Sequence, residues 1–283
     1  MIDLVFGPLA YGFMQRGLAA AVAVGVLCAV IGCFVVLKGL AFIGDAISHA
    51  AFPGLVIAYI VGAPLYLGGA IAAVLTALAI GAVSRRGGLR FDTAVGVLFA
   101  GTYAFGILLF STIDNYVADL FGYLLGNVLG ITPTDLLQLV LLGGIVLAIL
   151  LVLRKELLFA TFDPLGAAAS GLPVGRLEYL LLALLGLTIV VSIQAVGIIL
   201  VVAMLVTPAA TAQLLFVRFN QLLAGSVAVA TASAVVGLYI SFYANVASGA
   251  SIVLVETLLF VLALLFSPRR GVISRGTRAV GTA

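Results

Sequence analysis

The chain has 283 residues, of which 65% are hydrophobic and only 8% are charged. An ordinary soluble domain has roughly 25% charged residues, so this composition excludes a soluble globular protein and indicates one that crosses a membrane several times. The formal net charge is +3, but the Lys and Arg residues lie at the ends of apolar runs and form no basic block. No nucleic-acid partner is therefore expected.

The apolar runs predict an all-α fold, a polytopic bundle of membrane-spanning helices. A helix needs about 20 apolar residues to cross ~30 Å of hydrocarbon. Runs of about that length follow one another along the chain: Leu18–Leu37, Leu40–Val61, Leu65–Val83, Thr93–Thr112, Leu136–Leu153, Leu177–Ile193, Val196–Phe216, Leu222–Ala244 and Ile252–Phe266. Gly197 and the Thr207-Pro208 pair could turn the sixth or seventh run into a broken or re-entrant segment, so the prediction is eight or nine crossings.

The basic residues between the runs predict which helix ends face the cytoplasm. Lys and Arg are enriched in cytoplasmic loops, and all of them except Arg16 fall in connections that can share that side. The C-terminal tail at 268–283 is then cytoplasmic. With nine crossings the N-terminus is external and residues 1–15 form a short interfacial segment, whereas eight crossings would change its side.

Two connections are longer than turns. Residues 113–134 carry Asp114 and Asp119 but no basic residue, which predicts an external loop whose acids attract cations, dock a partner or are simply solvated. Residues 154–176 are basic at both ends and are predicted to be cytoplasmic. No soluble domain interrupts the runs, so residues 1–283 are predicted to form a single transmembrane domain.

The second apolar run holds the strongest candidate site. Asp45 and His49, the only histidine, are four residues apart, and they therefore lie on one helical face with Ser48. Counted from Lys38 at the cytoplasmic boundary, Asp45 lies about 10 Å and His49 about 16 Å into the bilayer. A carboxylate in hydrocarbon costs at least ~2.5 kcal/mol, so a chain that keeps one there usually has a pathway, a partner or an ion beside it.

The chemistry of this pair allows three interpretations. A carboxylate oxygen stacked on an imidazole nitrogen forms half of a site for a first-row divalent metal, and a dimer could double it. The pair could also be a structural hydrogen bond or a proton relay. Pro53 adds a local feature, because it has no N–H to donate to the His49 carbonyl and leaves that oxygen free unless another group pairs with it.

A short, well-capped helix is predicted in the cytoplasmic connection, at 163–173. Asp163 suits the N-cap, Pro164 suits the first helical position, and Gly171 suits the end of the helix. This segment is either a simple connector or a surface for a partner.

Glu256 is the other acid well inside an apolar run, where it could line an access path or turn its carboxylate outward. Cys28 and Cys33 lie five residues apart in the first run and are expected to be small packing residues. The sequence has no Gly-x-x-x-x-Gly-Lys-[Ser/Thr] motif, so this chain is not expected to hydrolyse ATP or to be an enzyme.

The segment at 42–54, FIGDAISHAAFPG, resembles the signature of the permease subunits of manganese, zinc and iron ABC importers, the ABC-3 family. Individually weaker similarities run nearly from end to end: FMQR at 13–16, VGVLF at 95–99, FDP at 162–164 with GLP at 171–173, TPAA at 207–210 and SGASIV at 248–253. The resemblance implies a type II-like importer permease in the bacterial cytoplasmic membrane. It also implies a homodimer, two cytoplasmic ATPase subunits and an external metal-binding protein as partners.

The resemblance assigns the transported metal to Asp45 and His49, with Asn245, Ser48 and Glu256 as weaker candidate ligands. Asn245 stands where some relatives of this family have Asp. No permanently bound cofactor is expected, because the metal is the cargo. One imidazole with one carboxylate favours Mn²⁺ over Zn²⁺, while Zn²⁺ and Fe²⁺ stay open as cargo.

The resemblance also assigns coupling to the ATPase to the predicted cytoplasmic helix, through Asp163, Pro164, Ala167, Ser170 and Gly171.

Two other classes of function are compatible with an acid inside the membrane. An intramembrane aspartyl protease would need a second aspartate at the depth of Asp45, and every other Asp lies in a loop or at the end of a run. A proton-coupled secondary carrier of metal or small solutes would use Asp45 and His49 as a proton relay, but no inverted repeat is detected.

Overall fold

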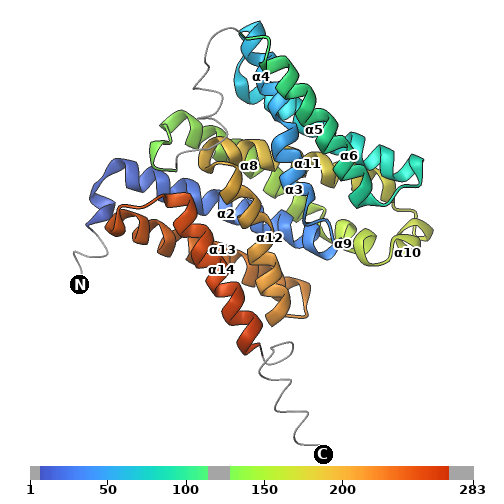
Figure 1. The fold of residues 1–283 in the computed structure, drawn as a ribbon. Helices are drawn as coiled ribbons and strands as arrows, with labels where there is room; N and C mark the ends of the chain where they lie inside the picture. Colours follow the sequence, from blue (N-terminus) through green and yellow to red (C-terminus); the bar gives the residue numbers. More distant parts are fainter. Residues whose placement is uncertain (1–6, 114–127, 268–283) are drawn as a thin grey trace, which may run out of the picture.

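The computed structural model describes residues 7–113 and 128–267, and in these ranges it is an all-α bundle without strands (Figure 1). Nine spans in the described part are long and apolar enough to cross a membrane. They are α2 (Gly12–Leu37), α3 (Ile43–Ala50) continued by α4 (Phe52–Val61), α5 (Leu65–Gly87), α6 (Phe91–Phe110), α8 (Pro133–Val152), α11 (Val174–Val196), α12 (Ile198–Leu215), α13 (Phe219–Ala244) and α14 (Ser248–Phe266). The predicted polytopic helical bundle is confirmed, with the higher of the two expected helix counts.

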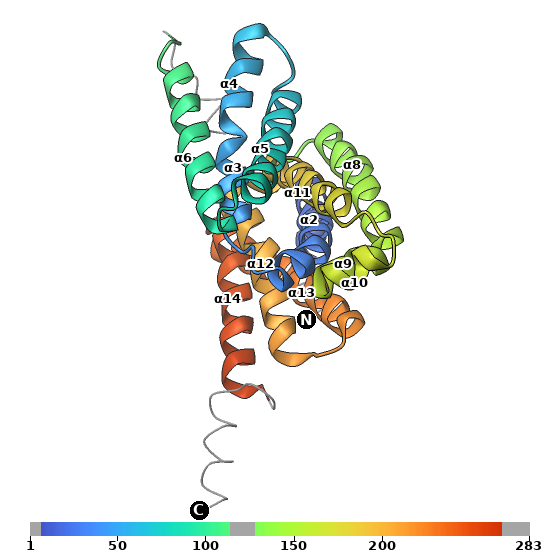
Figure 2. The ribbon, with the colours of Figure 1, turned by 90° about the vertical axis from the view of Figure 1, so that its right-hand side faces the viewer.

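Three of the spans form the centre of the bundle. In α2, α3–α4 and α11, 72% of the most apolar 18-residue window is buried, compared with 17% in α6 and 22% in α8 and α14. Figure 2 shows α6 and α8 on opposite sides of the bundle, with α2 and α11 between them. Lipid tails are as apolar as a protein interior, so the outer helices need no polar face toward their surroundings. Helix contacts must therefore be selected by shape.

Glycines permit the closest of these contacts. Gly54 of α4 and Gly68 of α5 lie backbone to backbone, and a Cβ on either one would collide with the carbonyl oxygen of the other. Gly32 of α2 lies against the carbonyl of Leu205 in α12 in the same way. Small residues at these crossings let membrane helices approach closely enough for dispersion contacts to stabilise the bundle.

The basic helix ends lie together at one side of the bundle. Glu178 near the start of α11 lies 3.9 Å from Lys38 Nζ and 3.3 Å from Arg85 Nη1, and so it links the ends of α2, α5 and α11. The Ser267 hydroxyl donates a hydrogen bond of 2.7 Å to the Leu214 carbonyl and links the ends of α14 and α12. These ends are the ones that the charge pattern assigns to the cytoplasm.

The opposite side of the bundle differs from the prediction at the start of the chain. Helix α2 begins at Gly12, six residues before the predicted Leu18, so residues 12–15 are helical and not part of an interfacial segment. Arg16 is therefore a helix residue, and its Nε donates to the Ile131 carbonyl at 3.3 Å. The helix continues past its apolar run because polar side chains near a membrane surface are compatible with helical backbone.

Two junctions resolve the doubt about the sixth and seventh runs. Gly197, with φ of +86°, is the only residue between α11 and α12, and each helix is long enough to span by itself. Pro208 lies inside α12, which continues through it. The connection between α8 and α11 contains α9 (Arg154–Phe162), which the sequence did not predict, before α10 (Pro164–Ala169). Asp114, Asp119, the first six residues and the tail at 268–283 lie outside the described residues.

Candidate metal-binding site

Asp45 and His49 lie side by side on one face of α3. His49 Nε2 is 3.5 Å from Asp45 Oδ1, and the two side chains are 31% and 51% exposed. The opposite face of α3 is closed, because Ile43 and Ile47 are buried in the bundle. The pair therefore faces outward from the subunit, where a ligand or a second protein chain can reach it.

Aromatic side chains of α6 hold the imidazole on its other side. The His49 ring centroid lies 5.7 Å from that of Phe99 and 5.2 Å from that of Tyr103, which meets it edge to face. Tyr103 also contacts Phe52, with 6.0 Å between ring centroids. Edge-to-face and tilted contacts at these distances are favourable and fix ring orientation. The imidazole is thus oriented toward Asp45 by packing against α6.

The break between α3 and α4 brings α6 close enough for these contacts. The Ala51 N–H donates to the Ile47 carbonyl at 3.0 Å and the Leu55 N–H to the Ala51 carbonyl at 3.2 Å, so the chain turns at Ala51 without becoming a loop. Pro53 lies in the first turn of α4, where its missing N–H does least harm. Gly106 of α6 packs directly on Phe52 and Pro53, and a Cβ there would collide with both.

A second carboxylate, that of Asp92, lines the same cavity as Asp45. A cavity of about 260 Å³ is lined by Asp45 and Asp92, together with Leu40, Phe42, Phe91 and Val95 among others. Asp92 lies in the first turn of α6, two residues after Arg90, at a helix end that the charge pattern predicts to be cytoplasmic. Asp92 was not among the residues that the sequence singled out. Its only signal was an acid in a helical first turn, which usually serves to stabilise the helix terminus.

The weaker candidate ligands lie elsewhere. The buried Ser48 hydroxyl donates to the Gly44 carbonyl at 2.7 Å and so turns along its own helix. Asn245 is the C-cap of α13 in the left-handed conformation. Glu256 is fully buried within α14. In the ranges that the structure describes, no group of three or more His, Cys, Asp and Glu side chains could hold a metal.

The connection between α8 and α11 contains the short helix that its capping residues predict. Asp163 Oδ1 accepts from the Gly166 N–H at 2.8 Å, Pro164 begins α10, and Gly171 follows with φ of +84°. The Ser170 hydroxyl donates to the Gly166 carbonyl at 2.8 Å.

One face of this short helix is anchored and the other is open. Ala167 is fully buried, whereas Leu165 is 83% exposed and Phe162, just before the helix, is 65% exposed. The connection therefore presents an apolar surface on a rigid, capped turn.

Residues 10–267 match the ABC 3 transport family. The chain belongs to this family. The resemblance seen in the Asp45 segment is thus confirmed over nearly the whole chain, and the chain is a multi-pass protein of the cytoplasmic membrane with nine candidate spans among its described residues.

Other members of this family are similar to the chain over almost their full lengths. The manganese transport system membrane protein MntC of Halalkalibacterium halodurans is 48% identical over 267 residues, which are 94% of this chain and 91% of that protein. The chelated iron transport system membrane protein YfeD of Yersinia pestis is 43% identical over 267 residues, 94% and 90% of the two chains. A solved structure, PsaBC from Streptococcus pneumoniae in complex with Fab, has a TM-score of 0.85 at 35% identity and covers 99% of this chain and 100% of that one.

Proposed function

We propose that this ABC 3 family member is the permease of an ATP-driven importer of divalent transition metal ions and that Mn²⁺ is its cargo. The main support is the Asp45–His49 pair, which is partly exposed on the outward face of α3. Its imidazole packs against aromatic residues of α6. The relatives named for manganese and for iron transport support this class of cargo.

The distance between the two donor atoms fits a shared ion. Two ligands about 2.1 Å from one metal ion lie about 3–3.5 Å apart at octahedral to tetrahedral angles. Asp45 Oδ1 and His49 Nε2 are 3.5 Å apart. Oxygen ligands suit Mn²⁺ more than Zn²⁺, so a site of carboxylate, imidazole and water favours manganese.

A second copy of the chain would complete the coordination sphere. Two side chains cannot saturate a divalent ion, and the exposed edge of the pair faces away from its own subunit. In a homodimer with α3 at the interface, the partner subunit would contribute the same carboxylate and imidazole. The cargo would then pass between two subunits and not through the centre of one.

Asp92 gives this path a direction. The cavity that contains Asp45 continues to Asp92 at the cytoplasmic start of α6. Carboxylates at successive depths lower the cost of moving a cation through hydrocarbon. An ion released from Asp45 would therefore meet Asp92 on its way to the cytoplasm, after delivery from an external binding protein.

The cytoplasmic ATPase subunit would bind at the surface around α10. A cytoplasmic ATPase subunit on each permease chain would cover the exposed Leu165 and Phe162, and the capped helix would transmit ATPase closure to α9 and α11. A rigid, well-capped segment transmits such a displacement better than a flexible loop.

Metal uptake by the reconstituted complex tests this function. Proteoliposomes with permease, ATPase and binding protein should accumulate Mn²⁺ only with ATP inside. Their uptake of Zn²⁺ and of Fe²⁺ should be slower than their uptake of Mn²⁺. Uptake that needs no ATPase and follows a pH gradient would instead support the proton-coupled carrier. ATP-dependent uptake with Zn²⁺ preferred over Mn²⁺ would overturn only the assignment of Mn²⁺ as the cargo and would leave the importer function standing.

A further inference from the structure

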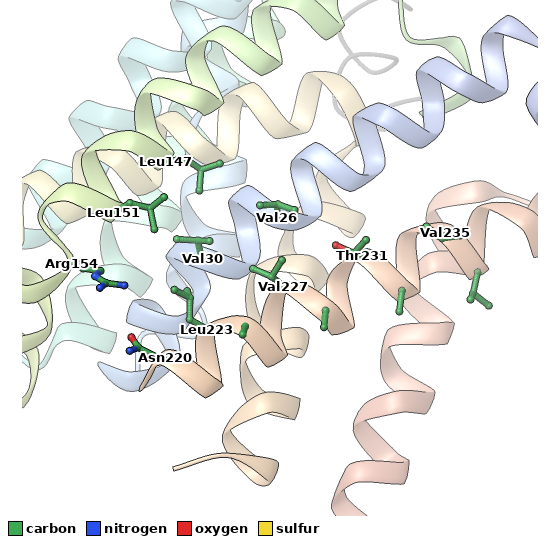
Figure 3. Close-up of a pocket in the computed structure, with 14 residues that line it drawn as sticks. Val26, Val30, Leu147, Leu151, Arg154, Asn220, Leu223, Val227, Thr231 and Val235 are labelled. Carbon is green, nitrogen blue, oxygen red and sulfur yellow. The ribbon is translucent and has the colours of Figure 1, made fainter. Parts of the chain in front are cut away.

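A long apolar groove runs along the bundle between α8 and α13, over α2 (Figure 3). Its volume is about 900 Å³. Aliphatic side chains form most of its lining, among them Val26 and Val30 of α2, Leu147 and Leu151 of α8, and Val227 of α13. No carboxylate lines the groove, so neither the proposed cation cargo nor a polar solute has a reason to bind in it.

Small side chains give the groove its depth. Ala224, Ala228 and Ala232 succeed one another at four-residue spacing along the lining face of α13 and are exposed. Leu223 and Val235 flank them. A linear channel with aliphatic walls has the shape of a hydrocarbon chain.

One end of the groove is polar and cationic. Figure 3 shows Arg154, from the start of α9, and Asn220, from the start of α13, at the same end. Arg154 is exposed and makes no ion pair with any carboxylate in the described part of the chain. The charge pattern assigns this end to the cytoplasmic boundary, where anionic lipid headgroups lie.

We propose that this groove is a binding site for an anionic phospholipid of the cytoplasmic leaflet. Arg154 pairs with the headgroup phosphate, whose geometry a guanidinium matches with two parallel hydrogen bonds. The Asn220 amide donates a further hydrogen bond. One acyl chain lies along α13 in the groove.

The dimensions support a lipid of one leaflet. The lining of the groove on α13 runs from Asn220 to Val236, which corresponds to about 24 Å along the helix. One acyl chain reaches about half of the ~30 Å hydrocarbon thickness, so it fits within the groove when it starts from the Asn220 end. The site lies on α8 and α13, whereas Asp45 and His49 belong to α3, which contacts α6. Figure 2 shows α6 and α8 on opposite sides of the bundle, so a lipid can stay bound while an ion passes.

Native mass spectrometry of the purified full-length chain tests the headgroup contact. With phosphatidylglycerol added, the wild-type chain should retain one more lipid than with phosphatidylcholine. Arg154→Gln should weaken phosphatidylglycerol binding about fivefold, the change expected for one basic contact with an anionic lipid surface. Arg86→Gln, which removes an exposed cytoplasmic arginine outside the groove, is the matched control and should bind as wild type. Equal binding by wild type and Arg154→Gln would overturn the proposal.

A second variant tests the acyl chain. Ala228→Leu fills the groove, and it should reduce phosphatidylglycerol binding even though Arg154 is intact. Ala148→Leu, at an exposed position of α8 outside the lining, should not change it. Thermal unfolding of each variant in detergent checks that it is folded. Displacement of the lipid by inorganic phosphate alone, or crosslinking of groove residues to another protein chain and not to a photoactivatable phosphatidylglycerol, would contradict a lipid site.

Discussion

Asp45 and Glu256 are both acids inside membrane-spanning helices, yet they lie in opposite surroundings. Asp45 is 51% exposed on the outward face of α3 and lies 3.5 Å from His49. Glu256 is 0% exposed in α14, and neither of its carboxyl oxygens has a hydrogen-bond partner among the described residues. An open acid can be completed by an ion or by a second subunit, whereas an enclosed one is limited to its own neighbours.

Position inside the membrane does not by itself identify an acid as a candidate ligand; exposure and neighbouring ligand groups do. An acid in hydrocarbon is costly wherever it lies, so its cost alone points equally to Asp45 and to Glu256. A stacked imidazole, an accessible edge and a second carboxylate in the same cavity occur only at Asp45. The contrast therefore predicts that substitutions at the two positions affect transport very differently.

The largest effect is expected from Asp45→Asn. Loss of the proposed charged ligand should reduce Mn²⁺ uptake by the reconstituted complex about 100-fold or more, because loss of even an outer-shell partner of a metal costs about 10- to 100-fold. The amide has the same shape, so assembly and thermal stability should be retained. Thr102→Ala on α6, whose hydroxyl bonds its own helix at Leu98, is a control that should leave uptake within about twofold. Wild-type uptake by Asp45→Asn would remove the site.

A smaller effect is expected from Asp92→Asn. Asp92 shares a cavity with Asp45 but is not the residue that stacks on His49. On the proposed path it would therefore assist release of the ion and would not hold it. Uptake should fall about tenfold, the lower end of the range for outer-shell partners. Equilibrium binding of Mn²⁺ to the purified complex, measured by calorimetry, should be unchanged. A loss of binding equal to that of Asp45→Asn would instead make Asp92 a ligand.

A change in helix packing should disturb the Asp45 side of the contrast without touching a ligand. In Gly106→Ala the new methyl group meets Phe52 and Pro53 and pushes α6 away from the break in α3–α4. Overpacking of this kind costs about 1–3 kcal/mol, so the melting temperature in detergent and the rate of uptake should both fall.

Gly101→Ala is the matched control, because it lies on the same helix with nothing within 4 Å of an added Cβ. It should be neutral or slightly stabilising, since Ala favours a helix over Gly. Equal melting temperatures for the two variants would show that α6 does not depend on this contact.

The sequence predicts the helices well because apolar length is a local property. Each predicted run corresponds to one helix, except that the run Leu40–Val61 is divided into α3 and α4, and the capped turn at Asp163 could be predicted from three residues. The inward turn of Ser48 was also readable, because a helical serine commonly bonds the carbonyl four residues earlier, here Gly44. The capping role of Asn245 follows a similar local preference for left-handed backbone.

The surroundings of His49 could not be predicted in this way. Phe99, Tyr103 and Asp92 come from α6, which α4 and α5 separate from His49 along the chain. Every membrane helix is apolar on all sides, so periodicity does not indicate which faces meet. The contact depends on Gly106, whose role appears only when α6 is placed against Phe52.

The smallest effect is expected from Glu256→Gln, which sharpens the contrast from the other side. Because no described residue donates a hydrogen bond to either oxygen, removal of the acid breaks no hydrogen bond within the described part of the chain. An amide of the same volume keeps the packing, so Mn²⁺ uptake should stay within about twofold of wild type, in line with substitutions away from specific interactions. Uptake and thermal unfolding of the same preparation give both readings. A loss as deep as that of Asp45→Asn, with unchanged stability, would show that exposure does not separate the two acids and that the ion also meets α14.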